Sequence, residues 1–241
     1  MNKTIHIFIV SWPGQHEKAL HIAKTLNGAS EYLSIIFSGA DSNLINSKGS
    51  FNYISCDDQS FWGDKFQTSI QHCCGEIMLM IHADCLCRDW LGLLNKCRVA
   101  MQTSEIAVYA PYILGTPWTL QRCRLKSYAD SELVDVAQTD MLVFALSAPI
   151  INRMKHIEYI NNKFGWGVDW IFVSASYANG YRVVVDTSIR VIHSVGSGYS
   201  RKQASKEMGQ FLLQMNQAEA IQYKKLIAHI KKRTSRQPSF F

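Results

Sequence analysis

The chain has 241 residues, 47% of them hydrophobic, which is enough to bury the core of one α/β domain. No apolar run approaches the ~18 residues of a membrane span, and the seven cysteines lack the spacing of a disulfide framework, so we expect reduced thiols in a cytosolic compartment. The formal net charge of +6 is uneven: residues 1–200 carry 16 Lys and Arg against 17 Asp and Glu, whereas residues 201–241 carry 9 against 2.

Strand and helix patterns alternate through the N-terminal half. The apolar run at residues 4–10 predicts a buried strand and a turn rather than a signal peptide. We expect further strands at residues 32–37, 52–55, 76–81 and 106–110, and helices at residues 15–27, 65–74 and 90–101. This alternation predicts βαβ units and a mainly parallel sheet, in which ligands bind beyond the carboxyl ends of the strands.

The second half is less regular. Residues 111–135 mix Gly, Pro and Trp with basic residues and predict loops and antiparallel pieces. We then expect a strand at 141–146, a helix at 169–179, a strand at 181–185, one long or two joined helices at 202–232, and disorder at 234–241. The predicted organisation is a domain at 1–200 followed by a basic helical extension and tail at 201–241.

Asp84 follows an apolar strand, in the sequence His82-Ala83-Asp84. A carboxylate on the rim of a sheet suits Mg²⁺ or Mn²⁺, which prefer hard oxygen ligands and can neutralise a diphosphate. The alternative is an aspartate that caps the following turn.

Two later residues could complete such a site. Asp169 opens a helix after the glycine-flanked Trp166, where it could take a proton from a hydroxyl group or simply cap the helix. His193 follows the next strand and precedes a Gly-rich loop that could act as a lid. A purely structural histidine is the alternative reading.

The order of these motifs resembles that of inverting, family-2-type nucleotide-sugar glycosyltransferases with the GT-A fold, over about residues 4–200. That resemblance implies a Rossmann-like, mainly parallel sheet flanked by helices. It also implies that Asp84 and His193 bind Mn²⁺ or Mg²⁺, that Asp169 is the catalytic base, and that Trp166 forms part of the acceptor wall. His82 replaces the first acid of the family's D-x-D motif, of which Asp84 is the second. Val168 replaces the first acid of the pair that opens the later helix in the family, of which Asp169 is the second.

Donor contacts are also implied by the resemblance. They fall at the ends of predicted strands and at the start of a helix: Ser11, Trp12, Asp41, Lys65, His82 and Asp84. The implied reaction moves one sugar from a nucleotide diphosphate-sugar to a hydroxyl acceptor, a surface glycan or lipid-linked glycan, with inversion. The replacements at 82 and 168 leave open a degenerate GT-A domain that acts as a binding or scaffold module.

Other patterns are weaker. Cys85-x-Cys87 near His82 fits no common zinc module, and the chain has no phosphate-binding loop of the P-loop or dinucleotide type. The basic tail is compatible with a solvated helix face, with an anionic membrane surface, or with nucleic acid, which would suit a transferase that glycosylates modified DNA bases. We expect a cytoplasmic protein. The basic tail suggests, as an alternative, peripheral attachment at the inner face of the membrane.

Overall fold

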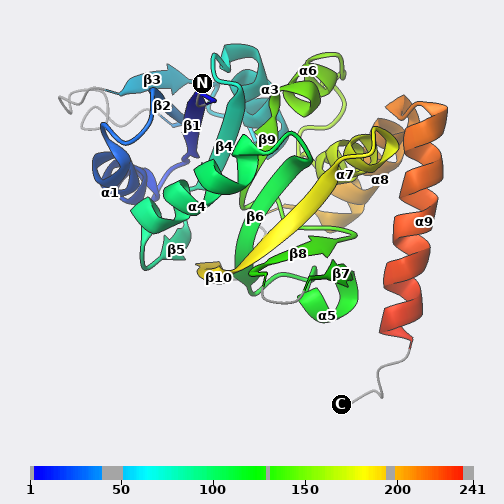
Figure 1. Cartoon of the computed structure of the whole chain (residues 1–241). Helices are drawn as coiled ribbons and strands as arrows, with labels where there is room; N and C mark the ends of the chain where they lie inside the picture. The colour runs from blue at the N-terminus through cyan, green and yellow to red at the C-terminus, as the bar shows by residue number, and fades with distance from the viewer. Residues whose placement is uncertain (1–2, 40–50, 129–130, 194–198, 236–241) are drawn as a thin grey trace, which may run out of the picture.

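The computed structural model describes residues 3–39, 51–128, 131–193 and 199–235. In this part of the chain ten strands form one sheet with helices on both faces (Figure 1). The strands are β1 (Ile5–Val10), β2 (Tyr32–Phe37), β3 (Asn52–Ser55), β4 (Ile77–His82), β5 (Cys85–Cys87), β6 (Ile106–Leu114), β7 (Arg124–Ser127), β8 (Leu133–Val136), β9 (Val143–Ser147) and β10 (Arg182–His193). The helices are α1 (His16–Leu26), α3 (Trp62–His72), α4 (Trp90–Gln102), α5 (Leu120–Cys123), α6 (Ala148–Lys155), α7 (Val168–Ala178), α8 (Arg201–Phe211) and α9 (Gln217–Thr234), with a 3-10 turn, η1 (Leu212–Gln214), before α9.

The sheet order is β3-β2-β1-β4-β9-β6-β10-β8-β7, with β5 paired to β10. Strands β3, β2, β1 and β4 are parallel, as are β6 and β10. Strand β9 lies antiparallel between β4 and β6. The predicted α/β class, with its C-terminal helical extension, is confirmed, and the antiparallel insertion of β9 is the main addition to it.

Two apolar cores hold the layers together. Strands β1 and β4 are buried along their whole length, because helices cover both faces of the sheet. One core packs α1 and α4 on one face, around residues such as Ile22 and Leu93. The other packs α3, α6, α7 and α9 on the opposite face, around Phe66, Phe144 and Phe172. The carboxyl ends of β1 and β4 are therefore fixed between two rigid layers.

Several boundaries differ from those that the sequence predicts. Helix α3 begins at Trp62 rather than 65, because the Asp64 carboxylate accepts a hydrogen bond from the Phe61 amide and caps the first turn. Strand β10 continues past the predicted end at 185 to His193, since it pairs with β6 on both sides of a register shift. Strand β5 and helix α6 were not predicted, although Pro149 in the first turn is a helix-start signal for α6.

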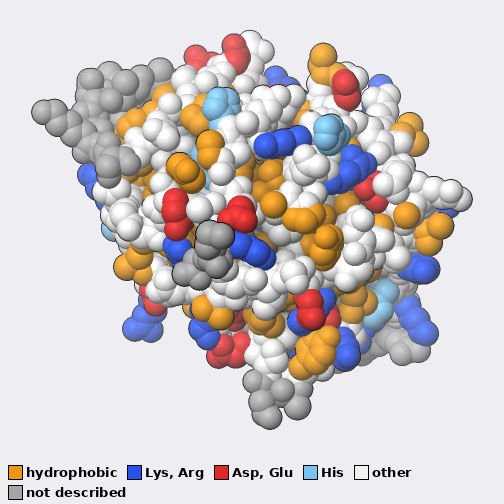
Figure 2. Space-filling model, turned by 45° about the horizontal axis from the view of Figure 1, so that its top comes forward, with side chains coloured by type: hydrophobic (Ala, Val, Ile, Leu, Met, Phe, Trp, Pro, Cys, Tyr) orange, Lys and Arg blue, Asp and Glu red, His pale blue; other side chains and the backbone are white. Residues whose placement is uncertain are grey.

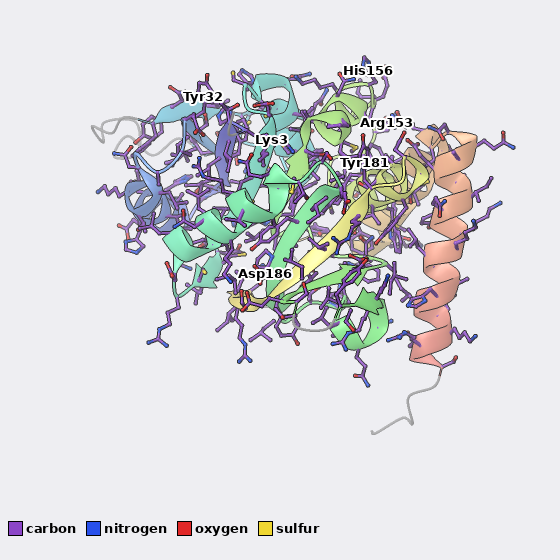
Figure 3. The ribbon with its side chains drawn as sticks, viewed as in Figure 1. Lys3, Tyr32, Arg153, His156, Tyr181 and Asp186 are labelled. Carbon is purple, nitrogen blue, oxygen red and sulfur yellow. The ribbon has the colours of Figure 1, made fainter. Side chains whose placement is uncertain are left out.

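The C-terminal extension consists of two helices with a break at Met215. The Asn216 side chain accepts a hydrogen bond from the Glu219 amide, and the Glu219 carboxylate accepts one from the Asn216 amide, so the pair caps α9. Arg153 of α6, labelled in Figure 3 beside these helices, forms a two-fold hydrogen-bonded ion pair with Glu219. Thr234, where we predicted disorder to begin, is the last residue of α9, and residues 236–241 lie outside the described part of the chain.

No helix within the described residues is long and apolar enough to cross a membrane. On the face shown in Figure 2, basic and acidic side chains are interspersed among the described residues. The exposed lysines of α9 are Lys224, Lys225, Lys231 and Lys232.

Candidate active site

A cavity of about 520 Å³ lies at the carboxyl ends of β1 and β4, where the parallel part of the sheet predicts a ligand site. Six of the predicted site residues line it: Trp12, Lys65, His82, Asp84, Trp166 and His193. Ser11 and Asp169 do not line it, and Asp41 falls outside the described residues. A second cavity, of about 430 Å³ between α1 and the start of α4, contains none of the predicted site residues.

Asp84 and His193 lie side by side although they are far apart in the chain. Strand β5 pairs antiparallel with the end of β10, which brings the His193 Nε2 atom to 3.1 Å from Asp84 Oδ2. The other carboxylate oxygen, Asp84 Oδ1, is buried and has no hydrogen-bond partner among the residues that the structure describes. A buried, unsatisfied oxygen beside an imidazole nitrogen is a site at which a cation can bind.

Asp84 and His193 each favour the charged form of the other. The hydrogen bond to Asp84 raises the pKa of His193 above its ordinary value. Burial acts to raise the pKa of Asp84, but the hydrogen bond from His193 and the two nearby histidines outweigh it, so the pKa of Asp84 is lowered. Asp84 is thus an ionised carboxylate at neutral pH.

His82 is a buried, neutral imidazole. Its Nε2 atom accepts a hydrogen bond from Trp62 Nε1, and its ring contacts the Trp12 ring edge-on. Burial lowers the pKa of His82 to about 4. His82 therefore offers hydrogen bonding, but no charge, at the position where the D-x-D motif has its first acid.

Lys65 supplies a buried positive charge to the cavity. The side chain is 2% exposed, and its Nζ atom donates to the Ser11 carbonyl oxygen at 2.8 Å and lies 5.7 Å from the centre of the Trp12 ring. Burial lowers the pKa of Lys65 to about 8. No carboxylate forms an ion pair with it among the described residues. The Ser11 hydroxyl is engaged elsewhere, in a hydrogen bond with His16 Nδ1 at 2.8 Å.

Asp169 lies in the first turn of α7 and is not among the residues that line the cavity. Gly167, at φ +90°, turns the chain into the helix. Asp169 Oδ2 accepts a hydrogen bond from Gln138 Nε2 at 3.2 Å, and Oδ1 accepts one from the Trp170 amide at 2.9 Å. Burial, followed by the negative charge of Asp140, raises the pKa of Asp169 to about 7.

Asp140 is a cavity residue that the sequence did not single out. It lines the cavity with Asp84 and His193, its Oδ1 accepts the Met141 amide at 2.8 Å, and its Oδ2 accepts the Thr116 hydroxyl. Burial raises its pKa. From the sequence we considered only the carboxyl ends of parallel strands. Strand β9 is antiparallel to β4, so the start of β9, which Asp140 precedes, lies at the cavity.

Aromatic side chains form one wall of the cavity. Trp166 Nε1 donates to the Tyr199 hydroxyl at 2.9 Å, and Phe164 stacks on the Tyr199 ring with centres 4.7 Å apart. Such side chains combine flat apolar faces with polar groups at one end.

Comparison with solved structures identifies the fold. The chain is similar to GalNAc-T7, solved with UDP, GalNAc and Mn²⁺ (TM-score 0.66, 10% identity, 96% of this chain and 54% of that chain). It is also similar to the mannosyltransferase PcManGT of Pyrobaculum calidifontis, solved with GDP-Man and Mn²⁺ (TM-score 0.59, 10% identity, 99% and 77%), and to residues 1–349 of S. aureus TarS (TM-score 0.57, 9% identity, 95% and 80%).

The chain spans about half the length of the GalNAc-T7 chain. No family model matches the sequence, and no curated protein matches it. The predicted GT-A glycosyltransferase fold is confirmed, at identities that show the fold alone.

Proposed function

We propose that this protein is a metal-dependent glycosyltransferase that moves one sugar from a nucleotide diphosphate-sugar to a hydroxyl acceptor with inversion. The observation that carries the proposal is the Asp84–His193 pair, with its unsatisfied buried oxygen, in one cavity with the buried cation of Lys65. The GT-A fold, shared with transferases solved with UDP or GDP-Man, supports it.

The residues present fit Mn²⁺ or Mg²⁺. Asp84 and His193 would hold the ion, and no cluster of three or more His, Cys, Asp or Glu ligands occurs among the described residues. Two protein ligands suit these cations, which keep several positions for water and substrate phosphates. Bound there, the metal supplies charge neutralisation for the leaving diphosphate.

The donor would lie along the sheet end between β1 and α3. Lys65, oriented by the Ser11 carbonyl, would donate to an oxygen of the nucleotide, and Trp12 would pack against its base or ribose. His82, held by Trp62, would offer its remaining ring nitrogen to the ribose. We also propose that Asp41, which falls outside the described residues, contacts the donor.

We assign Asp169 as the base. The proton of the acceptor hydroxyl would pass to the Asp169 carboxylate as the hydroxyl oxygen bonds to the anomeric carbon and the bond from that carbon to the diphosphate oxygen breaks. A pKa of about 7 suits a general base at neutral pH, and such help is typically worth ~10²–10⁴-fold in rate. Gln138 fixes the carboxylate, and Trp166 with Tyr199 would face the acceptor.

The remaining assignments concern the acceptor and the extension. We assign the chemistry to residues 1–200. We assign residues 201–241 as an extension that stabilises α7 by packing α9 against it. The acceptor would be a hydroxyl of a surface or lipid-linked glycan, reached at the cytoplasmic face of a membrane. The exposed lysines of α9 would favour an anionic surface, either lipid headgroups or nucleic-acid phosphates.

Thermal unfolding with a panel of UDP, GDP, ADP and dTDP, with and without Mn²⁺, tests the proposal. At ~100 times its dissociation constant a ligand adds ~2.7 kcal/mol, a shift on the order of 5–10 °C for a chain of this size. We expect a Mn²⁺-dependent shift with one nucleotide in the wild type and in the surface control Asp57→Ala, and none in Asp84→Ala.

Turnover separates the enzyme from the binding module. We expect release of nucleoside diphosphate from the matching sugar donor, reduced at least ~10²-fold in Asp169→Asn. A nucleotide-dependent shift without turnover would favour the scaffold alternative. Turnover that is unchanged in Asp169→Asn would show that the base is another residue.

A further inference from the structure

Asp140 occupies the region between the two ends of the proposed reaction. It lines the cavity together with Asp84 and His193, and its charge acts on both His193 and Asp169. In an inverting transfer, the anomeric carbon lies between the leaving diphosphate and the attacking hydroxyl. In the proposed arrangement the donor sugar would lie beside Asp140 in this cavity.

The Asp140 carboxylate is held in place without being neutralised. The Met141 amide donates to Oδ1 and the Thr116 hydroxyl donates to Oδ2. Each carboxylate oxygen can accept a second hydrogen bond. No Lys or Arg forms an ion pair with Asp140 in the described ranges. A carboxylate of this kind accepts hydrogen bonds from hydroxyl groups and, in its ionised form, repels another carboxylate.

Two simpler roles for Asp140, a turn cap and a third metal ligand, account for fewer of these contacts. A turn aspartate needs only the bond from the Met141 amide, whereas Asp140 also accepts a hydrogen bond from the Thr116 hydroxyl and lines the cavity. A third metal ligand would have to stand with Asp84 and His193, and the described residues contain no such three-membered cluster.

We propose that Asp140 binds hydroxyl groups of the donor sugar and selects neutral sugars over sugars that carry a carboxylate. This inference rests on the proposed function and deepens it, since it makes Asp140 a specificity-determining residue of the same cavity. The sugar class that fits is a neutral hexose or N-acetylhexosamine, and a uronic acid is excluded by charge.

The test compares donors that differ by one carboxylate. Binding of UDP-glucose and UDP-glucuronate, and of GDP-mannose and GDP-mannuronate, is measured by titration calorimetry in Mn²⁺, with UDP and GDP alone as references. The variants are Asp140→Asn, which keeps the shape and removes the charge, Thr116→Val, which removes one orienting hydrogen bond, and the surface control Asp57→Asn.

We expect the wild type to prefer the neutral sugar of the pair whose nucleotide it binds, and Asp140→Asn to lower that preference ~10–100-fold, as loss of a hydrogen bond to a charged group implies. Affinity for UDP or GDP alone should stay unchanged. Thr116→Val should weaken binding of the neutral sugar nucleotide while it keeps the discrimination against the uronate, because the charge remains.

The failures can be told apart. If UDP or GDP binds but the preference is the same in the wild type and Asp140→Asn, the role given to Asp140 is wrong and the proposed function stands. If the wild type binds neither UDP, GDP nor any of the four donors, this inference is overturned, and the proposed function fails as well when the full panel of UDP, GDP, ADP and dTDP gives no thermal shift. If Asp140→Asn does not fold, a Thr116→Val variant that binds the neutral donor as the wild type does overturns the inference.

Discussion

Replacing Asp169 by Asn should change how the stability of the protein depends on pH. The carboxylate is 6% exposed, and burial together with the charge of Asp140 raises its pKa from 3.8 to about 7. Between these two pH values the folded state holds a proton that the unfolded state has released. The free energy of unfolding therefore falls as pH rises from about 4 to about 7, and is flat with respect to this group above that.

The magnitude follows from the size of the shift. One pH unit is worth 1.36 kcal/mol for a full proton, so the whole window amounts to about 4 kcal/mol and the part above pH 5 to roughly 3 kcal/mol. Asn has no proton to release. The stability of Asp169→Asn relative to the wild type should therefore rise by about 3 kcal/mol between pH 5 and pH 8, on the order of 5–10 °C in Tm.

Urea unfolding followed by tryptophan fluorescence at pH 5, 6, 7 and 8 measures this difference. Asp57→Asn, on an exposed turn, reports the effect of removing one surface charge. A difference between the wild type and Asp169→Asn that stays constant from pH 5 to pH 8 would refute the reasoning, because it would mean that Asp169 is not protonated in the folded protein.

Four further outcomes follow from the packing and from the buried charges. Gly63→Ala should cost ~1–3 kcal/mol or more in urea unfolding, since the added Cβ would lie 2.0 Å from a backbone carbonyl oxygen; Gly209→Ala, with open space around its helical site, should stabilise by ~0.5–1 kcal/mol. Arg153→Met should cost ~3–5 kcal/mol because it leaves the buried Glu219 unpaired, and adding Glu219→Leu should recover most of that loss. Lys65→Met should weaken nucleotide binding at least ~10-fold in calorimetry, as loss of a charge-assisted hydrogen bond implies, without lowering Tm, because a desolvated ammonium is removed.

Local patterns were sufficient for most of the elements. The strands at 32–37 and 52–55 have the predicted bounds, α1 is shorter than predicted by one residue at each end, and α4 is longer by one residue at its C-terminal end. These segments carry their own information, because a run of apolar residues or a 3.6-residue periodicity is visible within a single window. Strand ends of a parallel sheet meet at one edge, which brings Trp12, His82 and Asp84 to one cavity.

Other features depend on which distant strands pair, and these are set by the tertiary structure alone. Asp84 and His193 meet across 109 residues because β10 runs on past a bulge to pair with β5. Asp140 reaches the cavity because β9 enters the sheet antiparallel. The neutral His82 and the raised pKa of Asp169 follow from burial. The sequence thus determined the α/β elements, the order of the acids and histidines, and the basic extension. Pairing, direction and burial depend on the packing of the whole chain, and only the fold supplied them.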